Sequence, residues 1–391
     1  LIHNSIKNKN INFTIDIEKS IKENDIIFIA VGTPMNDDGS PNMKYIKKVS
    51  EDIGEYIDSH KIIITKSTIP AGTTFKVKNT IQKKIELRNK KISFDIANNP
   101  EFLKEGRALS DFMVPDRIIV GLENKSIKNI FKELYKPFSF NHEKLIFMDI
   151  RSSELTKYAS NAMLATKISF INEMAIVAEK VGADINQIRK GIGSDSRIGY
   201  SFIYPSIGYG GSCFPKDIHA ILNFSNENKY NPRILDAVNK VNQDQKKYFF
   251  IKIINKFLKN NKLEGKKFGV WGLSFKPGTD DMRESASIYI INQIIELGGE
   301  VKVYDPKAMD NAKEYYFKNL TNIKYCDDKY EVLHNSDALI LITEWPEFRS
   351  PDFNLIKAKL NTPIIFDGRN QYDKNILSEM GIEYYQIGVS T

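Results

Sequence analysis

Short apolar runs that end in polar turns recur along the first part of the chain. Three of them are typical of buried parallel strands: Asp25–Val31, Lys61–Thr65 and Ile92–Ala97. Helical stretches lie between the runs, and the turns that follow them are residues 32–34, 66–70 and 98–100. This alternation predicts a doubly wound α/β sheet, whose ligands bind at the carboxyl ends of the strands.

The pattern changes in the middle of the chain. From Ser152 to about Lys190 the apolar spacing is helical, and a loop rich in Gly, Ser and Tyr is expected from Gly191 to Asp217. The stretch from about Arg233 to Asn260 predicts a helix long enough to form a spine between domains. A helical central domain is therefore expected.

A second strand–helix pattern begins near Lys266. Four further strands are predicted, at 267–272, 301–306, 338–343 and 363–367, with a helix from Ser285 to Leu297. We therefore predict an α/β fold class, with two Rossmann-like doubly wound domains joined by a helical central domain. The expected boundaries are 1–150, 151–262 and 263–391.

The first domain differs from the second at its start. A dinucleotide-binding unit opens with a strand, a glycine-rich turn and a following acidic residue, and nothing before Asp25 fits this pattern. The turn from Gly269 to Gly272 is the comparable feature in the second domain. We expect that the first domain lacks its opening β-α-β segment.

Composition and charge exclude several classes of protein. The net charge of +7 is spread along the chain, which does not favour nucleic-acid binding, and no apolar run reaches the roughly 18 residues of a membrane span. The polar first ten residues do not resemble a secretion signal. The two cysteines, Cys213 and Cys326, favour a reducing cytoplasm, and the five histidines have no spacing typical of a metal site.

Cys213 lies in the segment with the strongest chemical signal, Gly208-Tyr-Gly-Gly-Ser-Cys-Phe-Pro-Lys-Asp217. Glycines allow the backbone to approach a ligand closely, and a neighbouring cation such as Lys216 favours a thiolate. A cysteine alone would be interpreted as a small buried residue. In this context we interpret Cys213 as an activated nucleophile. Cys326 follows a predicted strand and is interpreted as structural.

Other polar residues are weaker candidates by themselves. Lys157 and Asn161 share one face of an apolar helix, where a buried Lys could act as a base or hold an oxyanion, or could simply reach solvent. Glu101 and Glu105, and also Thr68, follow predicted strands, where helix capping is the alternative to a functional role. Cations in 275–285 and at Arg369 suit phosphate groups, with surface ion pairs as the alternative.

Together these segments resemble the UDP-glucose/GDP-mannose dehydrogenase family. The resemblance runs in order along the chain through Val31-Gly-Thr-Pro34, Lys66-Ser-Thr-Ile-Pro70, Asn99-Pro-Glu-Phe-Leu103, Lys157 with Asn161, Gly210–Asp217 and Phe275-Lys-Pro277. The Cys-Phe-Pro-Lys-Asp form, with Arg197-Ile-Gly199 before it, is most similar to the UDP-glucose branch. The resemblance implies an NAD-binding domain, a dimerising central domain and a UDP-sugar-binding domain. It also implies that roughly sixty residues carrying the glycine-rich NAD turn are missing.

The resemblance further implies a reaction and its residues. The family oxidises a sugar C6 alcohol to a carboxylate with two NAD+, which here means UDP-glucose to UDP-glucuronate through a thiohemiacetal and a thioester on Cys213. The implied catalytic residues are Cys213, Lys157, Asn161, Asp217, Glu101 and Thr68. The implied NAD contacts are Val31, Thr33, Pro34, Thr68, Glu105, Lys216 and Arg283. The implied substrate contacts are Glu101, Phe102, Leu103, Lys157, Asn161, Arg197, Phe202, Tyr204, Gly210, Phe275, Lys276 and Arg369.

Arg197 would reach the substrate of a partner subunit, which implies a homodimer, and Tyr204 departs from a Lys found in some members. Three alternatives stay open. The first is the same chemistry on UDP-N-acetylhexosamine or GDP-mannose. The second is a two-electron dehydrogenase of the hydroxyacid type, which needs no cysteine. The third is an inactive UDP-sugar-binding fragment.

Overall fold

The computed structural model describes residues 2–36, 38–138 and 144–390. The chain divides into two compact units, 1–159 and 160–391. Within the described ranges, none of the helices combines the length and apolar character of a membrane span.

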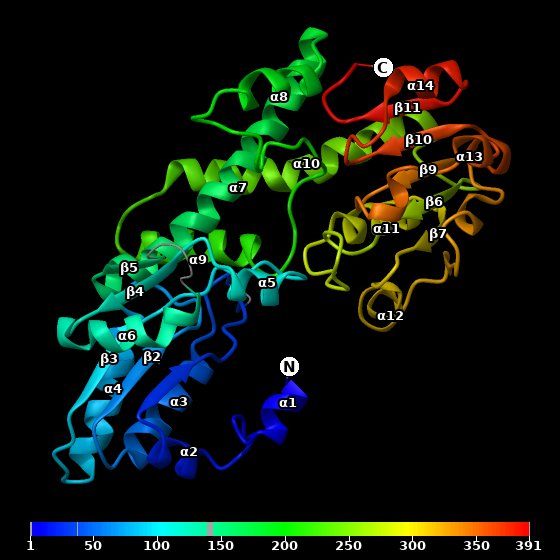
Figure 1. Cartoon of the computed structure of the whole chain (residues 1–391). Coiled ribbons are helices and arrows are strands. Elements are labelled where there is room, and N and C mark those ends of the chain that lie inside the picture. The colour runs from blue at the N-terminus through cyan, green and yellow to red at the C-terminus, as the bar shows by residue number, and fades with distance from the viewer. Residues whose placement is uncertain (1, 37, 139–143, 391) are drawn as a thin grey trace. The chain divides into compact units, whose positions relative to one another are not determined.

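The first unit contains a five-stranded sheet in the order β1-β2-β3-β4-β5 (Figure 1). All neighbouring strands are parallel except β3 and β4, which are antiparallel. The strands are β1 Ile26–Ile29, β2 Lys61–Thr65, β3 Phe94–Asn98, β4 Ile118–Leu122 and β5 Leu145–Met148. The first three were predicted from their apolar runs, and β4 and β5 were not.

Helices cover both faces of this sheet, as a doubly wound fold requires. Alternation along β2 explains the two layers: Ile63 packs with α3 and α4 on one face, whereas Ile62 and Ile64 pack with α6 on the other. The helices of this unit are α1 Ile2–Lys7, α2 Ile17–Glu23, α3 Lys44–Tyr56, α4 Thr73–Leu87, α5 Ala108–Met113 and α6 Lys128–Tyr135.

The predicted helical middle is present, but its boundaries differ from the prediction. The stretch 152–190 forms two helices, α7 Ile150–Val181 and α8 Ile185–Gly193, which are separated by Gly182 in a left-handed conformation. The expected loop 191–217 ends early, because α9 (Phe214–Glu227) begins directly after Cys213. The predicted spine helix is α10, Arg233–Phe257, although α7 with its 32 residues is longer.

The second unit also contains a six-stranded, wholly parallel sheet in the order β8-β7-β6-β9-β10-β11 (Figure 1). Counted along the chain from β6, this is the order 3-2-1-4-5-6 of dinucleotide-binding folds. The edge strand β8 is the strand predicted before Cys326, and the other edge strand, β11, was not predicted. The strands are β6 Lys267–Trp271, β7 Glu300–Tyr304, β8 Ile323–Tyr325, β9 Ala338–Leu341, β10 Ile364–Asp367 and β11 Glu383–Gln386.

Two apolar clusters cover the faces of this sheet. On one face, Phe268 and Phe366 pack with α11 (Ala286–Glu296) and with Phe257 of α10, so α10 is tied to the sheet. On the other face, Trp271 and Leu339 pack with α13 Phe353–Lys359 and α14 Lys374–Glu379. The short helix α12, Met309–Asn311, lies on the first face, where Met309 packs against the first cluster. The predicted α/β fold class with two sheets and long central helices is confirmed.

Candidate active site

Two loops lie side by side at the carboxyl ends of β1 and β2. The Thr33 hydroxyl donates to the carbonyl oxygen of Thr68 at 3.0 Å, and the Ser67 hydroxyl donates to that of Val31 at 2.6 Å. Pro34 continues the first loop and accepts from the Asn42 amide. The structure therefore brings Val31, Thr33 and Thr68 together at the edge where nucleotides bind in such sheets.

Glu101 follows β3 and pairs with Lys157 of α7. The Lys157 ammonium is 3.2 Å from one Glu101 oxygen, and the Leu103 amide donates to the other at 2.6 Å. Lys157 is only 4% exposed, and its ammonium also lies 5.3 Å from the centre of the Phe102 ring. Burial of an isolated charge is unfavourable, but the carboxylate of Glu101 compensates the charge of Lys157. A buried lysine that is paired in this way can hold a substrate oxygen. Glu105 lies in the turn before α5.

Lys66 is a second, partly buried cation here, and no role was predicted for it from the sequence. Its ammonium donates to the side-chain oxygen of Asn99 at 3.1 Å and to the Asn99 carbonyl at 3.3 Å. Burial lowers the pKa of Lys66 to about 8; Glu101 opposes this shift and the charge of Lys157 adds to it. The signal in the sequence was a lysine directly after an apolar strand, two residues before Thr68.

Cys213 is exposed and occupies the cap position before α9, with Pro215 in the first turn of that helix. Its sulfur lies 3.6 Å from the Ser212 hydroxyl. The prediction that Cys213 lies in a loop was incomplete, because the Phe-Pro-Lys-Asp sequence after it is already helical; proline is favoured at the start of a helix. The amino end of a helix stabilises negative charge, so this placement suits a thiolate.

Asp217 is buried in the first turn of α9 and accepts two charged or polar donors. The Asn161 amide of α7 donates to one oxygen at 2.5 Å, and the Lys216 ammonium donates to the other. Asn161 is 8% exposed, and this hydrogen bond gives both its buried amide and the buried carboxylate of Asp217 a partner. The structure thus places Asn161, Lys216 and Asp217 in one contact group, close in sequence to Cys213.

The two glycines before Cys213 pack against a second loop of the same unit. A Cβ at Gly210 would lie 2.4 Å from the Glu284 carbonyl oxygen, and one at Gly211 would lie 2.6 Å from the Phe275 ring. The Gly211 amide donates to the Arg283 carbonyl at 2.7 Å. Only residues without a side chain allow this approach. Gly210, Phe275 and Arg283 are therefore neighbours, as a shared ligand site would need.

Buried side-chain amides that were not predicted from the sequence hold the loop of residues 206–212, here called the glycine loop, in place. Asn242 of α10 accepts from the Tyr209 amide at 2.8 Å and donates to its carbonyl at 3.0 Å. Gln245, one turn later, donates to Ser206, whose amide donates to Asn172 of α7. Polar residues three apart on a helix were the available signal, but only the fold shows that they face a loop.

Arg369 lies with Phe275 at the carboxyl ends of β10 and β6. Its guanidinium donates to the carbonyl oxygens of Ile342 at 2.6 Å and Phe275 at 3.3 Å. The Lys276 ammonium lies 5.2 Å from the Phe275 ring centre. Both cations thus lie at the edge of this sheet where nucleotide ligands bind. Arg369 also pairs with Glu344 at 3.1 Å, and a contact of either cation with phosphate stays a prediction.

The remaining predicted substrate residues lie in the segment before the glycine loop. Phe202 packs edge to face against Phe214, with a centroid distance of 6.3 Å. Tyr204 is exposed and stacks with the Arg189 guanidinium at 3.5 Å. Arg197 is exposed and forms an ion pair with Asp195 at 2.6 Å. The structure therefore places Phe202 beside the start of α9. The ion pair of Arg197 is with Asp195, which is not a predicted site residue.

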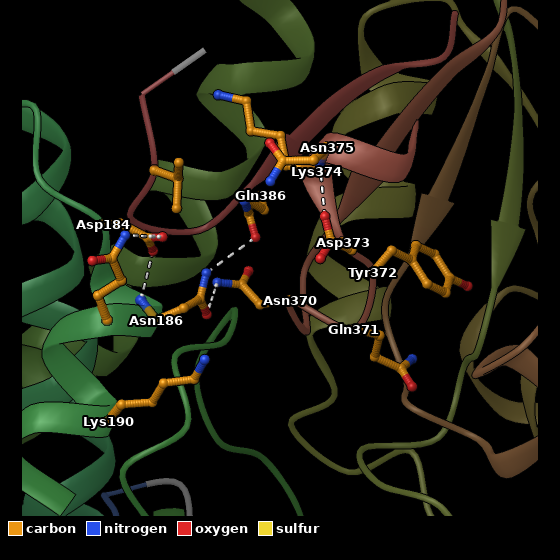
Figure 2. Close-up of a pocket in the computed structure, with 12 residues that line it drawn as sticks. Asp184, Asn186, Lys190, Asn370, Gln371, Tyr372, Asp373, Lys374, Asn375 and Gln386 are labelled. Carbon is orange, nitrogen blue, oxygen red and sulfur yellow. Dashed lines mark hydrogen bonds between the residues drawn. The ribbon is translucent and has the colours of Figure 1, made fainter. Parts of the chain in front are cut away.

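The second unit contains a pocket of about 900 Å³, and Figure 2 shows the residues that line it. Asn370 donates from its side chain to the Ile387 carbonyl at 2.7 Å, and Asn186 of α8 contacts Gln386 at 3.4 Å. None of the lining residues is a predicted catalytic or binding residue, although Asn370 adjoins Arg369. The lining residues are Asp184, Asn186, Gln187, Lys190, Asn370, Gln371, Tyr372, Asp373, Lys374, Asn375, Gln386 and Val389.

Three domain models of one family match the chain in order. They are the NAD binding domain at residues 1–139, the central domain at 151–244 and the UDP binding domain at 269–374 of the UDP-glucose/GDP-mannose dehydrogenase family.

Curated proteins and solved structures agree with this match. The chain is 40% identical to a UDP-glucose 6-dehydrogenase of Pseudomonas aeruginosa, over 96% of this chain and 83% of that protein. It is 38% identical to UDP-glucose 6-dehydrogenase TuaD of Bacillus subtilis, over 99% and 82%. The structure of a UDP-glucose dehydrogenase from Pyrobaculum islandicum superimposes with a TM-score of 0.87 at 31% identity, covering all of this chain and 85% of that one. This chain therefore belongs to the UDP-glucose/GDP-mannose dehydrogenase family.

Proposed function

We propose that this chain is an NAD-dependent UDP-glucose 6-dehydrogenase that oxidises UDP-glucose to UDP-glucuronate. The similar proteins named above carry this activity in their names. The observation that carries the proposal is the exposed Cys213 at the amino end of α9, one turn before the buried Asp217. A nucleophile in this position is what a four-electron oxidation needs and what a two-electron dehydrogenase does not.

The two oxidation steps differ in what they demand of the protein. NAD+, when bound, accepts the hydride in each step. In the first step the C6 hydroxyl loses its proton to a water, a role that the family resemblance assigns to Thr68 and Asp217, and the sugar becomes an aldehyde. The Cys213 sulfur then bonds to the aldehyde carbon, giving a thiohemiacetal. Loss of a second hydride gives a thioester, and water releases the carboxylate and regenerates the thiol.

Lys157 and Asn161 would stabilise the oxygen that carries negative charge in these steps. Each lies against a carboxylate with a proposed role, Lys157 against Glu101 and Asn161 against Asp217. Glu101 would assist the hydrolysis of the thioester. Donors of this kind typically lower the barrier by about 3 kcal/mol each.

Different residues are proposed to bind the UDP-sugar and NAD+. Phe102, Leu103, Arg197, Phe202, Tyr204, Gly210, Phe275, Lys276 and Arg369 would hold the UDP-sugar. Val31, Thr33, Pro34, Glu105, Lys216 and Arg283 would contact NAD+, and the strand ends in the first unit fit a nicotinamide nucleotide. The domain boundaries 1–150, 151–262 and 263–391 are proposed with these roles.

The partner proposed for this chain is a second copy of itself. Met163, Phe170 and Val177 of α7 are exposed at spacings of seven residues, so they form an apolar stripe on the helix. Exposed apolar stripes of this kind are covered in oligomers. We propose a homodimer in which Arg197, which is exposed, reaches the partner's substrate. A cytoplasmic location is proposed because both described cysteines are free.

The test is the number of NADH molecules formed for each UDP-glucose consumed, by this chain and by an amino-terminally extended form. We expect two per sugar. One per sugar would contradict the covalent mechanism and favour a two-electron dehydrogenase. Activity on UDP-N-acetylhexosamine or GDP-mannose instead would change the assigned substrate, and two per sugar from the extended form alone would show that the reaction needs the added residues.

The Cys213→Ser variant tests the nucleophile directly. Because the thiolate forms the covalent bond, kcat should fall by about a hundredfold or more while the Kd for UDP stays within about twofold. The Cys326→Ala variant is the control, since Cys326 is buried after β8 and has no proposed role. Equal loss of activity in both variants would contradict the assignment.

A further inference from the structure

Asp305 is a buried carboxylate to which no step above assigns a role. It follows β7, is 2% exposed and accepts hydrogen bonds on both oxygens. One oxygen accepts from the amides of Lys307 and Ala308 at 2.8 and 2.9 Å. The other oxygen, Oδ2, accepts from the Leu273 amide at 2.7 Å, the Ser274 amide at 3.0 Å, the Ser274 hydroxyl at 3.1 Å and the Trp345 indole at 3.0 Å.

Asp305 occupies a position in the sheet that binds ligand in related folds. β7 is the second strand of a sheet with the order 3-2-1-4-5-6, and dinucleotide-binding units carry an acidic residue near the end of this strand that holds a ribose hydroxyl. In this unit the carboxylate points back to the turn after β6. Six donors of the chain occupy it, so it is not available to a ribose.

The loop that Asp305 holds leads directly into the proposed substrate contacts. Leu273 and Ser274 precede Phe275 and Lys276, and their carbonyl groups are fixed as well. The Thr343 hydroxyl donates to the Ser274 carbonyl at 2.5 Å, and the Ser287 hydroxyl donates to the Leu273 carbonyl at 2.6 Å. With amides bound to Asp305 and carbonyls bound to hydroxyls, this stretch of backbone has little freedom. Such pre-organisation lowers the entropy cost of binding a ligand.

We propose that Asp305 is a positioning residue that uses the ribose-binding place of a dinucleotide fold to fix the Leu273–Lys276 loop for the uridine nucleotide. This inference rests on the proposed function, because it takes Phe275 and Lys276 as nucleotide contacts. Asp305 would act through that loop and would not touch the substrate.

The Asp305→Asn variant tests this role with almost no change in shape. Whichever way the amide turns, its NH2 group faces at least two donors, so the loop must move. We expect the Kd for UDP, measured by calorimetry on the full chain, to rise by about tenfold to a hundredfold. The KM for UDP-glucose should rise similarly, and the KM for NAD+ should stay within about twofold.

The Asp337→Asn variant is the matched control in the same domain. Asp337 is also a buried carboxylate, but it accepts from the Lys267 amide at the opposite end of β6. Both variants should lower the unfolding temperature, while only Asp305→Asn should weaken UDP binding. Equal UDP affinity in the two folded variants would overturn the proposal. If the unchanged chain binds UDP but does not oxidise UDP-glucose, the proposed reaction fails and the role of Asp305 stands; if it does not bind UDP, both fail.

Discussion

Lys66 shows how the environment of one residue changes its chemistry. The side chain lies beside Asn99 at the end of a buried strand, where water is largely excluded and a second cation, Lys157, is near. The neutral form of the amine is therefore favoured in the folded state, and the pKa falls to about 8. A lysine with this pKa changes charge close to physiological pH.

The contribution of Lys66 to stability should consequently grow as the pH rises above about 8. Between this folded pKa and the ordinary value of 10.5 the unfolded state binds more protons, so the free energy of unfolding increases with pH. The Lys66→Met variant should lose this increase. Urea unfolding followed by circular dichroism from pH 7 to 10 measures it.

The control is Lys78→Met, which removes a surface lysine paired with Glu123 at 2.6 Å. The difference in free energy of unfolding between this variant and the unchanged chain should show no rise across the same pH range. A pH dependence of Lys66→Met that matches the unchanged chain would contradict the lowered pKa.

At the scale of elements, the end of α7 is set by a single residue. Gly182 has a φ of 74°, and the amides of Gly182 and Ala183 donate back to Glu179 and Ala178. This is the usual glycine-terminated end of a helix. It allows α8 to begin three residues later with Asp184 as its cap. Apolar periodicity continues through this point, which explains why one helical stretch was predicted where there are two.

Two glycine-to-alanine variants distinguish the effect of backbone conformation from the effect of steric contacts. An added Cβ would meet nothing within 4 Å at either Gly182 or Gly191, but only Gly182 is left-handed. Gly182→Ala should lower the free energy of unfolding by about 1 kcal/mol, because the left-handed conformation is strained for alanine. Gly191→Ala, within α8, should raise it by about 0.5–1 kcal/mol. Chemical denaturation measures both, and changes of the same sign would show that φ is not the cause.

At the scale of the whole molecule, two compact units each have their own sheet and apolar core. The exposed stripe on α7 belongs to the second unit from residue 160 onward, and Phe170 at its centre is half exposed. An aromatic ring left in water at the middle of a 32-residue helix is best explained by a partner that covers it.

The Phe170→Glu variant should convert the proposed homodimer into monomers. A charge buried at an apolar interface is costly, so the dissociation constant should rise by about a hundredfold or more. Sedimentation velocity at several concentrations measures the change. Leu87→Glu is the control, because Leu87 is an exposed apolar residue at the end of α4. A monomeric unchanged chain, or dimers of Phe170→Glu, would contradict the proposal.

The sequence by itself determined the main elements and the chemistry-bearing segments. Buried parallel strands such as β2 and β6 are continuous apolar runs because both of their faces are covered, so the runs alone located them. β11 was not predicted, because it lies at a sheet edge and is only partly buried, which leaves a weak apolar signal. β4 was not predicted, although its five residues are as buried as those of β2. The segment around Cys213 was identified because its residue types are rare together.

Only the tertiary structure decided which polar residues meet. Asn242 and the glycine loop are 33 positions apart, and the carboxylate of Asp305 reaches Trp345 40 positions away. Local sequence contains no record of such partners, because a hydrogen bond depends on where the backbone has been brought by packing. The lowered pKa of Lys66 has the same origin, since burial and neighbouring charges exist only in the folded chain.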